Sequence, residues 1–286
     1  MPELPEVEVL VRHLAPLLKG MTIRSVAVHR EKVIRPDTPR SLAGRLKGSR
    51  FLGVERRAKF LIFRLRKPTG KGGRELSLLG HLGMTGRMYL QPARAPLPRH
   101  AAVSLDLGRI RFIYEDVRYF GRLTTNLSSL EKLGPEPLGD AFTVELFAEQ
   151  LKRSSQAIKV RIMDQAVVVG VGNIYASEAL FRAGISPRKA ARRLTRNEVG
   201  RLHAAIREVL QQAINCGSTI PLDFAGTGTR DGLFYYGSAA GESAYHREKL
   251  CVYDRGDEPC GACGAGIRRI VQAARSTYFC PGCQRG

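Results

Sequence analysis

The spacing of hydrophobic residues changes once along this chain, near residue 134. Before that point, apolar residues at helical spacing from Val7 to Leu18 predict one helix. The short runs that follow are rich in β-branched and aromatic residues and predict strands. These runs are 22–28, 50–65, 75–80, 86–90, 102–107 and 110–114. Because turn signals separate them and no long helical pattern intervenes, we expect an antiparallel β-sandwich or barrel.

Helical spacing dominates after a linker-like segment at 134–139. Helices are expected near 143–152, 156–166, 173–183 and 195–217. The last is the clearest, because Thr195 and Glu198 form a capping-box pair and Gly217 suits its C-terminal end. Residues 218–245 are rich in glycine and lack regular patterning, which predicts a long loop. We therefore expect domains over 1–134, 135–248 and 249–286.

Four cysteines near the C-terminus have the spacing of a zinc ribbon. They are Cys260, Cys263, Cys280 and Cys283. Each Cys-x2-Cys pair predicts a tight turn that offers two sulfurs to one ion, and residues 267–271 and 277–279 suit the hairpin between the turns. Four thiolates close the coordination sphere, so we expect one structural zinc ion that folds the ribbon and takes no part in catalysis. Disulfides or redox thiols are the alternative.

The charge of the chain indicates a polyanionic partner. Its 286 residues carry a formal net charge of +20, which favours nucleic acid over an anionic membrane. Three arginines of the expected hairpin, Arg268, Arg269 and Arg275, are candidate phosphate contacts. No apolar run approaches the ~20 residues of a membrane span, and no secretory segment follows Met1. We expect a cytoplasmic protein associated with the bacterial nucleoid.

The first residues carry candidate catalytic chemistry. Once Met1 is removed, Pro2 presents a secondary amine, beside the carboxylates of Glu3 and Glu6. An N-terminal amine has a reference pKa of ~8, so part of it is a free nucleophile at neutral pH. A proline amine that attacks an aldehyde-like carbon gives an iminium ion, which favours elimination at the next carbon. The alternative is a well-formed helix start, which also places carboxylates in the first turn.

Two sites have the features of a phosphate contact. Residues 170–172 read Gly-Val-Gly and lead into a predicted helix, so that backbone N–H groups and a capping Asn173 side chain face outward. Lys59 precedes the predicted strand Phe60-Leu61-Ile62-Phe63. A common turn and a solvated lysine are the ordinary interpretations.

A third group of residues is suited to filling space inside a duplex. Met84 lies between two glycines, and Arg118 and Phe120 lie near another turn. Core packing is the usual role of Met and Phe. Apolar wedges with an arginine are also what a protein needs to fill the gap when a base leaves the duplex.

Together these motifs resemble the formamidopyrimidine-DNA glycosylases of the wider endonuclease VIII superfamily. The resemblance spans nearly the whole chain. It rests on the sequences at 1–8, 56–59, 80–86, 170–178 and 275–284. It implies an α+β multidomain fold: an N-terminal antiparallel β-sandwich with flanking helices, followed by a helix-two-turn-helix module and a four-cysteine zinc ribbon. It also implies a base-excision-repair DNA glycosylase with AP lyase activity, acting on duplex DNA with a damaged base or abasic site.

The resemblance also implies residue roles. Pro2 would attack C1′ of the damaged nucleotide and form a Schiff base, with β,δ-elimination cutting the strand. Glu3 would protonate the sugar ring oxygen, Glu6 would hold the site, and Lys59 would contact phosphate and assist proton transfer. DNA contacts are expected from His81, Met84, Arg118, Phe120, Lys159, Asn173 and Arg275. Met84, Arg118 and Phe120 would occupy the vacated space. No organic cofactor is needed, and a monomer is expected.

One region departs from the family pattern. Residues 218–224 read Ser-Thr-Ile-Pro-Leu-Asp-Phe, without the arginine that is common in the segment leading to the lesion-capping loop. Oxidised purines are the expected substrates, while a different lesion preference or reduced glycosylase activity stays open. Two rival functions also remain at this point. A non-catalytic zinc-ribbon protein that binds nucleic acid does not explain Pro2, and a small-molecule enzyme with a catalytic N-terminal proline does not explain the charge.

Overall fold

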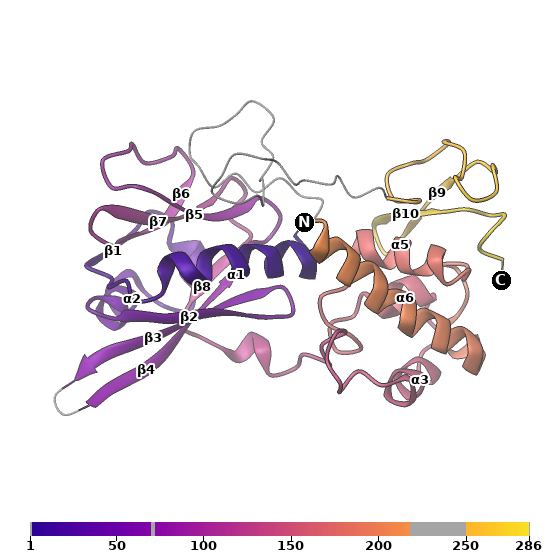
Figure 1. The fold of residues 1–286 in the computed structure, drawn as a ribbon, viewed down its shortest axis with the longest axis horizontal. Coiled ribbons are helices and arrows are strands. Elements are labelled where there is room, and N and C mark those ends of the chain that lie inside the picture. The colour runs from indigo at the N-terminus through magenta and orange to yellow at the C-terminus, as the bar shows by residue number, and fades with distance from the viewer. Residues whose placement is uncertain (1, 70–71, 218–249, 286) are drawn as a thin grey trace. The chain divides into compact units, whose positions relative to one another are not determined.

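The computed structural model describes residues 2–69, 72–217 and 250–285 (Figure 1). Within these ranges the chain divides into two compact units. The first contains Pro2 and Glu6–Glu131, and the second contains Glu3–Pro5, residues 132–217 and residues 250–285. The expected loop at 218–245 lies outside the described residues. No helix in the described ranges has the length and apolar character needed to cross a bilayer.

Two four-stranded antiparallel sheets form the first unit. One has the strand order β1-β6-β7-β5 and the other β2-β3-β4-β8. Their bounds are β1 Ser25–Val28, β2 Arg50–Arg57, β3 Phe60–Thr69, β4 Gly72–His81, β5 Gly86–Pro92, β6 Ala101–Asp106, β7 Ile110–Asp116 and β8 Arg122–Thr124. Residues of both sheets share one core, in which the rings of Phe63 and Phe112 lie 5.5 Å apart. The predicted sandwich is therefore confirmed.

Helices complete the first unit. α1 (Leu4–Leu18) places Val7, Leu10 and Leu14 in the sandwich core, as its apolar spacing predicted. α2 (Pro39–Leu46) begins with a proline and is capped by the Thr38 side chain. Two 3-10 turns, η1 (Glu31–Ile34) and η2 (Ser128–Leu130), lie in the connections.

The single strand predicted over 50–65 is wrong, because the chain reverses within it. Arg57 pairs with Phe60, so β2 and β3 form a hairpin whose turn is Ala58-Lys59. Ala58 has a φ of 54°, a conformation usually supplied by glycine or asparagine. Without those residues the turn carries no sequence signal. Its consequence is to place Lys59 at the tip of a hairpin.

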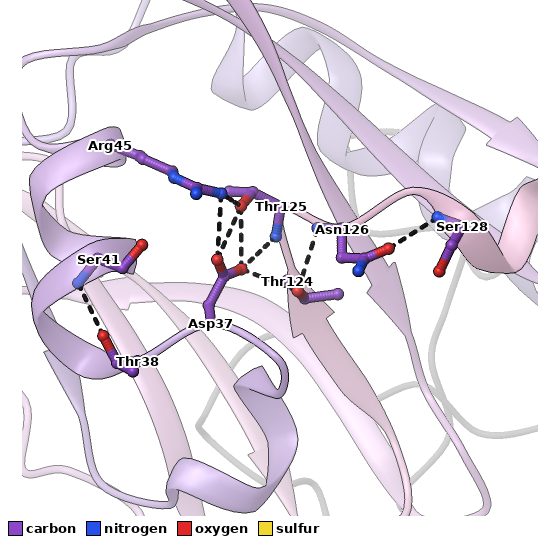
Figure 2. Close-up of polar contacts among 8 residues, drawn as sticks. All are labelled: Asp37, Thr38, Ser41, Arg45, Thr124, Thr125, Asn126 and Ser128. Atoms are coloured by element: carbon purple, nitrogen blue, oxygen red, sulfur yellow. Dashed lines mark hydrogen bonds and ion pairs between the residues drawn. The ribbon is translucent and has the colours of Figure 1, made fainter.

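A buried carboxylate connects two segments of the first unit (Figure 2). The Asp37 side chain accepts hydrogen bonds from the Thr124 hydroxyl at 2.8 Å, from the Thr125 N–H at 2.6 Å and from the Thr125 hydroxyl at 2.9 Å. Arg45 on α2 forms an ion pair with the same carboxylate at 3.2 Å. The loop before α2 is thereby joined to the end of β8.

Helices and a two-stranded ribbon form the second unit. The elements are α3 Val144–Lys152, α4 Ile158–Ile162, α5 Asn173–Arg182, η3 Ala191–Arg193, α6 Arg196–Asn215, β9 Arg268–Gln272 and β10 Arg275–Phe279. The capping box of Thr195 and Glu198 is present at the start of α6. α4 is shorter than the predicted 156–166, because Gln165 directs its amide to the carbonyls of Met163 and Val171 and so stabilises a turn. The strands β9 and β10 pair antiparallel, as the zinc-ribbon interpretation required.

Candidate functional site

The carboxylate of Glu3 lies at the N-terminus of α5. It accepts hydrogen bonds from the backbone N–H groups of Gly172 at 2.7 Å, Ile174 at 2.9 Å and Tyr175 at 3.4 Å. The N–H of Leu4 donates to the carbonyl of Gly170 at 3.1 Å. Glu3 is 2% exposed. Glu3, which follows Pro2, is therefore fixed by its own side chain and by the backbone hydrogen bond of Leu4.

Both glycines of the Gly-Val-Gly segment are needed for this arrangement. A Cβ on Gly172 would lie 2.3 Å from the Glu3 carboxyl carbon, and a Cβ on Gly170 would lie 2.4 Å from the Leu4 side chain. Gly170 also has a φ of +82°. We conclude that the absence of a side chain at Gly170 and Gly172 leaves room for Leu4 and Glu3.

The predicted role of this helix terminus needs correction. The sequence indicated a phosphate site capped by Asn173, but Gly172 is the N-cap and Asn173 is already helical. The carboxylate of Glu3 occupies the N–H groups that a phosphate would use, because an anion of the chain itself satisfies the positive end of the helix.

Asn173 instead belongs to a polar cluster with Lys159 and the ribbon. Its Nδ2 donates to the carbonyl of Ser276 at 2.9 Å, and its Oδ1 accepts from Lys159 Nζ at 2.6 Å. Lys159 also donates to the Ser276 carbonyl at 3.0 Å and the Thr277 hydroxyl at 2.8 Å. These contacts hold the first residue of α5 against β10.

Lys159 was expected to contact DNA, and its environment argues against a direct contact. The residue is 1% exposed, and the three hydrogens of its ammonium group match the three acceptors around it. Burial lowers the pKa of Lys159 to about 8. The nearby Arg275 also lowers this pKa, whereas Glu3 raises it. Lys159 therefore positions Asn173 and the ribbon. Arg275 is exposed at the first position of β10 and, within the described ranges, has no ion pair.

Lys59 and His81 lie close together in the first unit. Lys59 is 7% exposed, and the His81 ring lies 4.9 Å from the ring of Phe60, the next residue. Burial lowers the pKa of His81 to about 4, and the charges of Lys59 and Arg122 act in the same direction. Because His81 Nδ1 accepts the N–H of Gly83 at 3.1 Å, the neutral ring carries its proton on Nε2. His81 is thus a neutral donor at physiological pH.

Met84, Arg118 and Phe120 meet at the ends of the strands, although two separate loops carry them. A guanidinium nitrogen of Arg118 lies 3.3 Å from the Met84 sulfur, and the guanidinium carbon lies 4.7 Å above the Phe120 ring. Met84 is 46% exposed and Phe120 is 50% exposed. The usual core role of these two apolar residues is therefore excluded.

Pro2 and Glu6 are both buried, and Glu6 lies in the first turn of α1 with no exposed surface. The structure thus gathers the predicted site residues in two groups. The first unit holds Pro2, Glu6, Lys59, His81, Met84, Arg118 and Phe120, and the second holds Glu3, Lys159, Asn173 and Arg275 with the four cysteines.

The four cysteines of the ribbon form one cluster. All four sulfurs lie within 4.8 Å of one another, with 3.9 Å between Cys260 and Cys283 and 3.4 Å between Cys263 and Cys280. Four thiolates at the usual zinc distance of ~2.3 Å in a tetrahedron lie ~3.8 Å apart. The donor set and spacing therefore fit a structural zinc ion.

Sequence reasoning missed Asp116, a buried carboxylate between the two loops of the first unit. Its Oδ1 accepts from the Thr85 hydroxyl at 2.6 Å and the Arg118 N–H at 3.1 Å, and its Oδ2 accepts from the Gly121 N–H at 2.9 Å. A signal was present: Asp116 continues the alternation of Phe112 and Tyr114, which face the core. A carboxylate at an inward position needs several donors.

Family models match three parts of the chain. They are the formamidopyrimidine-DNA glycosylase N-terminal domain over residues 1–123, the formamidopyrimidine-DNA glycosylase H2TH domain over 133–223, and the zinc finger found in FPG and IleRS over 257–286.

Relatives match over the full length. The chain is 42% identical to the formamidopyrimidine-DNA glycosylase of Pseudomonas paraeruginosa and 40% identical to that of Pseudomonas putida, with all of both chains covered in each comparison. Its fold is similar to Lactococcus lactis Fpg bound to DNA that contains Fapy-dG, at 32% identity and a TM-score of 0.85, with both chains fully covered. The complex of that protein with abasic-site DNA matches at 34% identity and a TM-score of 0.84, over 99% of this chain and all of the other.

Proposed function

This chain belongs to the formamidopyrimidine-DNA glycosylase family, and on that premise we propose that Pro2 is its nucleophile and that oxidised bases are its substrates. A DNA glycosylase of base excision repair follows from the family itself. The Lactococcus lactis complexes contain Fapy-dG, an abasic site or an oxidised pyrimidine. We infer the same range of lesions here, with oxidised purines foremost.

The proposed reaction begins at the amine that removal of Met1 exposes. The nitrogen lone pair of Pro2 attacks C1′ of the damaged nucleotide, the glycosidic bond breaks, and the base leaves with the electron pair and takes up a proton. Opening of the sugar gives an iminium ion between Pro2 and C1′. Loss of a C2′ proton expels the 3′ phosphate, and a second elimination expels the 5′ phosphate. Water then hydrolyses the iminium and releases Pro2.

The anchoring of Glu3 is the observation that carries this proposal. Its carboxylate is held by three N–H groups, and Leu4 is held by Gly170, so the segment bearing the nucleophile is fixed before substrate binds. The three N–H groups hold the Glu3 carboxylate in one orientation. We assign to Glu3 the transfer of a proton to the sugar ring oxygen. Glu6, buried in the first turn of α1, would support the same segment.

Several cations and donors would hold the DNA backbone. Arg275 is exposed and Asn173 keeps one amide hydrogen beyond its internal contacts, so both are suited to phosphate. In the first unit, the Nε2–H of His81 and the ammonium of Lys59 offer a neutral and a charged donor side by side. Lys159 would act through Asn173. The exposed group of Met84, Arg118 and Phe120 would fill the space left by the extruded base.

A trapping experiment tests the nucleophile. Duplexes that contain 8-oxoguanine, a formamidopyrimidine, an oxidised pyrimidine or an abasic site are each incubated with the protein and borohydride, which reduces an iminium to a stable adduct. We expect adducts whose sugar maps to Pro2 by peptide mass spectrometry. Pro2→Gly, which replaces the secondary amine by a primary one, should form less adduct and keep duplex binding. A sugar that maps to any residue other than the N-terminal one would place the nucleophile elsewhere and overturn the proposal.

The zinc ribbon and the cellular location complete the proposal. Four thiolates leave no open position on zinc, so the ion would stabilise the hairpin that carries Arg275 and take no part in bond breaking. Chelation should release one zinc ion per chain and weaken DNA binding, whereas full affinity of the metal-free protein would contradict this role. We place the protein in the cytoplasm at the bacterial nucleoid, acting as a monomer.

A further inference from the structure

We propose that Asp116 is a positioning residue that locks two loops into one preformed wedge for base extrusion. We define the wedge loops as residues 82–86, which carry Met84, and residues 116–121, which carry Arg118 and Phe120. This inference rests on the proposed function, because it assigns a role within the extrusion step.

The Asp116 carboxylate joins the two loops directly. Its Oδ1 accepts from the hydroxyl of Thr85 at 2.6 Å, in the first loop, and from the backbone N–H of Arg118 at 3.1 Å, in the second. Its Oδ2 accepts from the N–H of Gly121 at 2.9 Å and from the hydroxyl of Tyr114 at 3.3 Å. The Thr85 hydroxyl also accepts the Arg118 N–H at 3.2 Å. Thr85, which follows Met84, and Gly121, which follows Phe120, are thus both bonded to one buried carboxyl group.

The loops also meet backbone to backbone. A Cβ on Gly83 would lie 2.6 Å from the Gly121 nitrogen, and a Cβ on Gly121 would lie 2.4 Å from the His81 carbonyl oxygen. Gly83 has a φ of +64°. Such close approach leaves no room for one loop to move without the other, so a single carboxylate can set the position of both.

The apolar side chains of the wedge are exposed to water, which costs free energy. Met84 and Phe120 are about half exposed, and the Arg118 guanidinium contacts both. Ordering such side chains only when DNA binds costs conformational entropy. Extruding a base costs further free energy for unstacking and unpairing. If the wedge is already assembled, its side chains need no further ordering when the base is extruded.

Asp116 has a matched control in the same unit. The Asp37 side chain is also buried, at 5% exposure, and accepts from three hydroxyl or amide donors of Thr124 and Thr125. Its partners lie on α2 and at the end of β8 and include no residue of the wedge loops. Asp37→Asn should therefore reduce stability to a similar extent and leave base extrusion unchanged. A second pair avoids any folding defect: Thr85→Val removes one hydroxyl, and Thr85→Ser keeps it.

The experiment compares two substrates under single-turnover conditions. One duplex contains 8-oxoguanine, which must be unstacked, and the other contains a preformed abasic site, which resists extrusion least. We expect Asp116→Asn to slow 8-oxoguanine excision about tenfold to a hundredfold, a loss of roughly 1.4–2.8 kcal/mol of transition-state stabilisation, while abasic-site trapping changes less than about threefold. Thr85→Val should slow excision about fivefold, and Thr85→Ser should restore it.

A 2-aminopurine base placed next to the lesion reports extrusion itself, and its fluorescence rise should slow in parallel with excision. Equal losses on both substrates, or an equal loss of excision in Asp37→Asn, would overturn the proposal. Failure of the wild-type protein to form any adduct with abasic duplex would instead contradict the proposed function.

Discussion

Asp37 and Asp116 are buried carboxyl side chains in two regions of the first unit, and each has hydrogen-bond donors that offset the cost of its burial. Each side chain accepts hydrogen bonds from at least one threonine hydroxyl and at least one backbone N–H group. Asp37 also has an arginine partner, at the junction of α2 and β8 (Figure 2). The donors around Asp116 lie instead in loops whose exposed side chains are candidate DNA contacts. The chemistry of a buried carboxylate therefore does not reveal its role, whereas the segments that it joins do.

The second unit contains a comparable buried residue of the opposite formal charge. Lys159 is a buried cation that donates to three acceptors, one on α5 and two on β10. Like Asp116, it joins segments that are distant in the sequence and next to candidate phosphate contacts. In both units, a buried polar group with a formal charge supports residues that are candidate DNA contacts.

The largest effect is expected from removing Asp37. Asp37→Ala leaves two threonine hydroxyls, one backbone N–H and Arg45 without their acceptor, so the free energy of unfolding should fall by about 3 kcal/mol. Urea unfolding measures the loss. Excision per folded molecule should not change, and a selective loss of excision would remove the distinction from Asp116.

A smaller loss is expected from Lys159→Met. The substitution keeps the apolar stem and removes one donor from each of three acceptors, which should cost about 2 kcal/mol of stability, although the Ser276 carbonyl still accepts from the Asn173 amide. Because Asn173 and the ribbon are then joined only by that one bond among those described, affinity for abasic duplex should also fall. Fluorescence anisotropy at two salt concentrations measures it. If Lys159 itself neutralised a phosphate, the salt dependence of binding would decrease by about one unit of slope, and the assigned role would be wrong.

Gly172→Ala addresses the anchoring of Glu3. The added methyl group overlaps the Glu3 carboxylate, so the N-terminal segment must move, and trapping on abasic duplex should slow about tenfold. Gly200→Ala in α6 is the matched control, because nothing lies within 4 Å of its Cβ position. Unchanged trapping with Gly172→Ala would show that the anchor is unnecessary for catalysis.

The smallest effect concerns pH. Burial lowers the pKa of His81 from 6.5 to about 4, so between these values the unfolded chain binds more protons than the folded one. The stability due to neutral His81 should therefore be lost as pH falls from 6.5 toward 4, by about 1 kcal/mol at pH 5 after allowance for partial exposure. The difference between wild type and His81→Gln in urea unfolding at pH 7 and pH 5 measures it. An equal difference at both values would contradict the assigned neutral state.

The sequence predicted most of the architecture because its signals are local. Alternating apolar residues identified the sandwich strands, and Thr195 with Glu198 identified the start of α6. The turn at Ala58 and the short strand β8 lacked such signals, since one has no glycine and the other has three residues. Cysteine spacing was sufficient for the zinc site because the ribbon is compact in sequence.

The site was less predictable where contacts join distant segments. Nothing in the local sequence shows that Glu3 caps α5, since 169 positions separate it from Gly172. Burial of Lys159 depends in the same way on β10, which follows more than 100 positions later. The resemblance named the residues, and the fold shows which of them face outward and which hold the others in place.

The anchor at Glu3 and Leu4 can form whether or not Met1 has been removed. None of its four hydrogen bonds involves the nitrogen of Pro2, which has no hydrogen to donate while Met1 is attached. A chain that retained its initiator would still form these bonds, yet at Pro2 it would carry an amide where the proposed chemistry requires a basic amine. The aminopeptidase that trims the newly made polypeptide would then act as the final switch that turns on a completed but dormant enzyme.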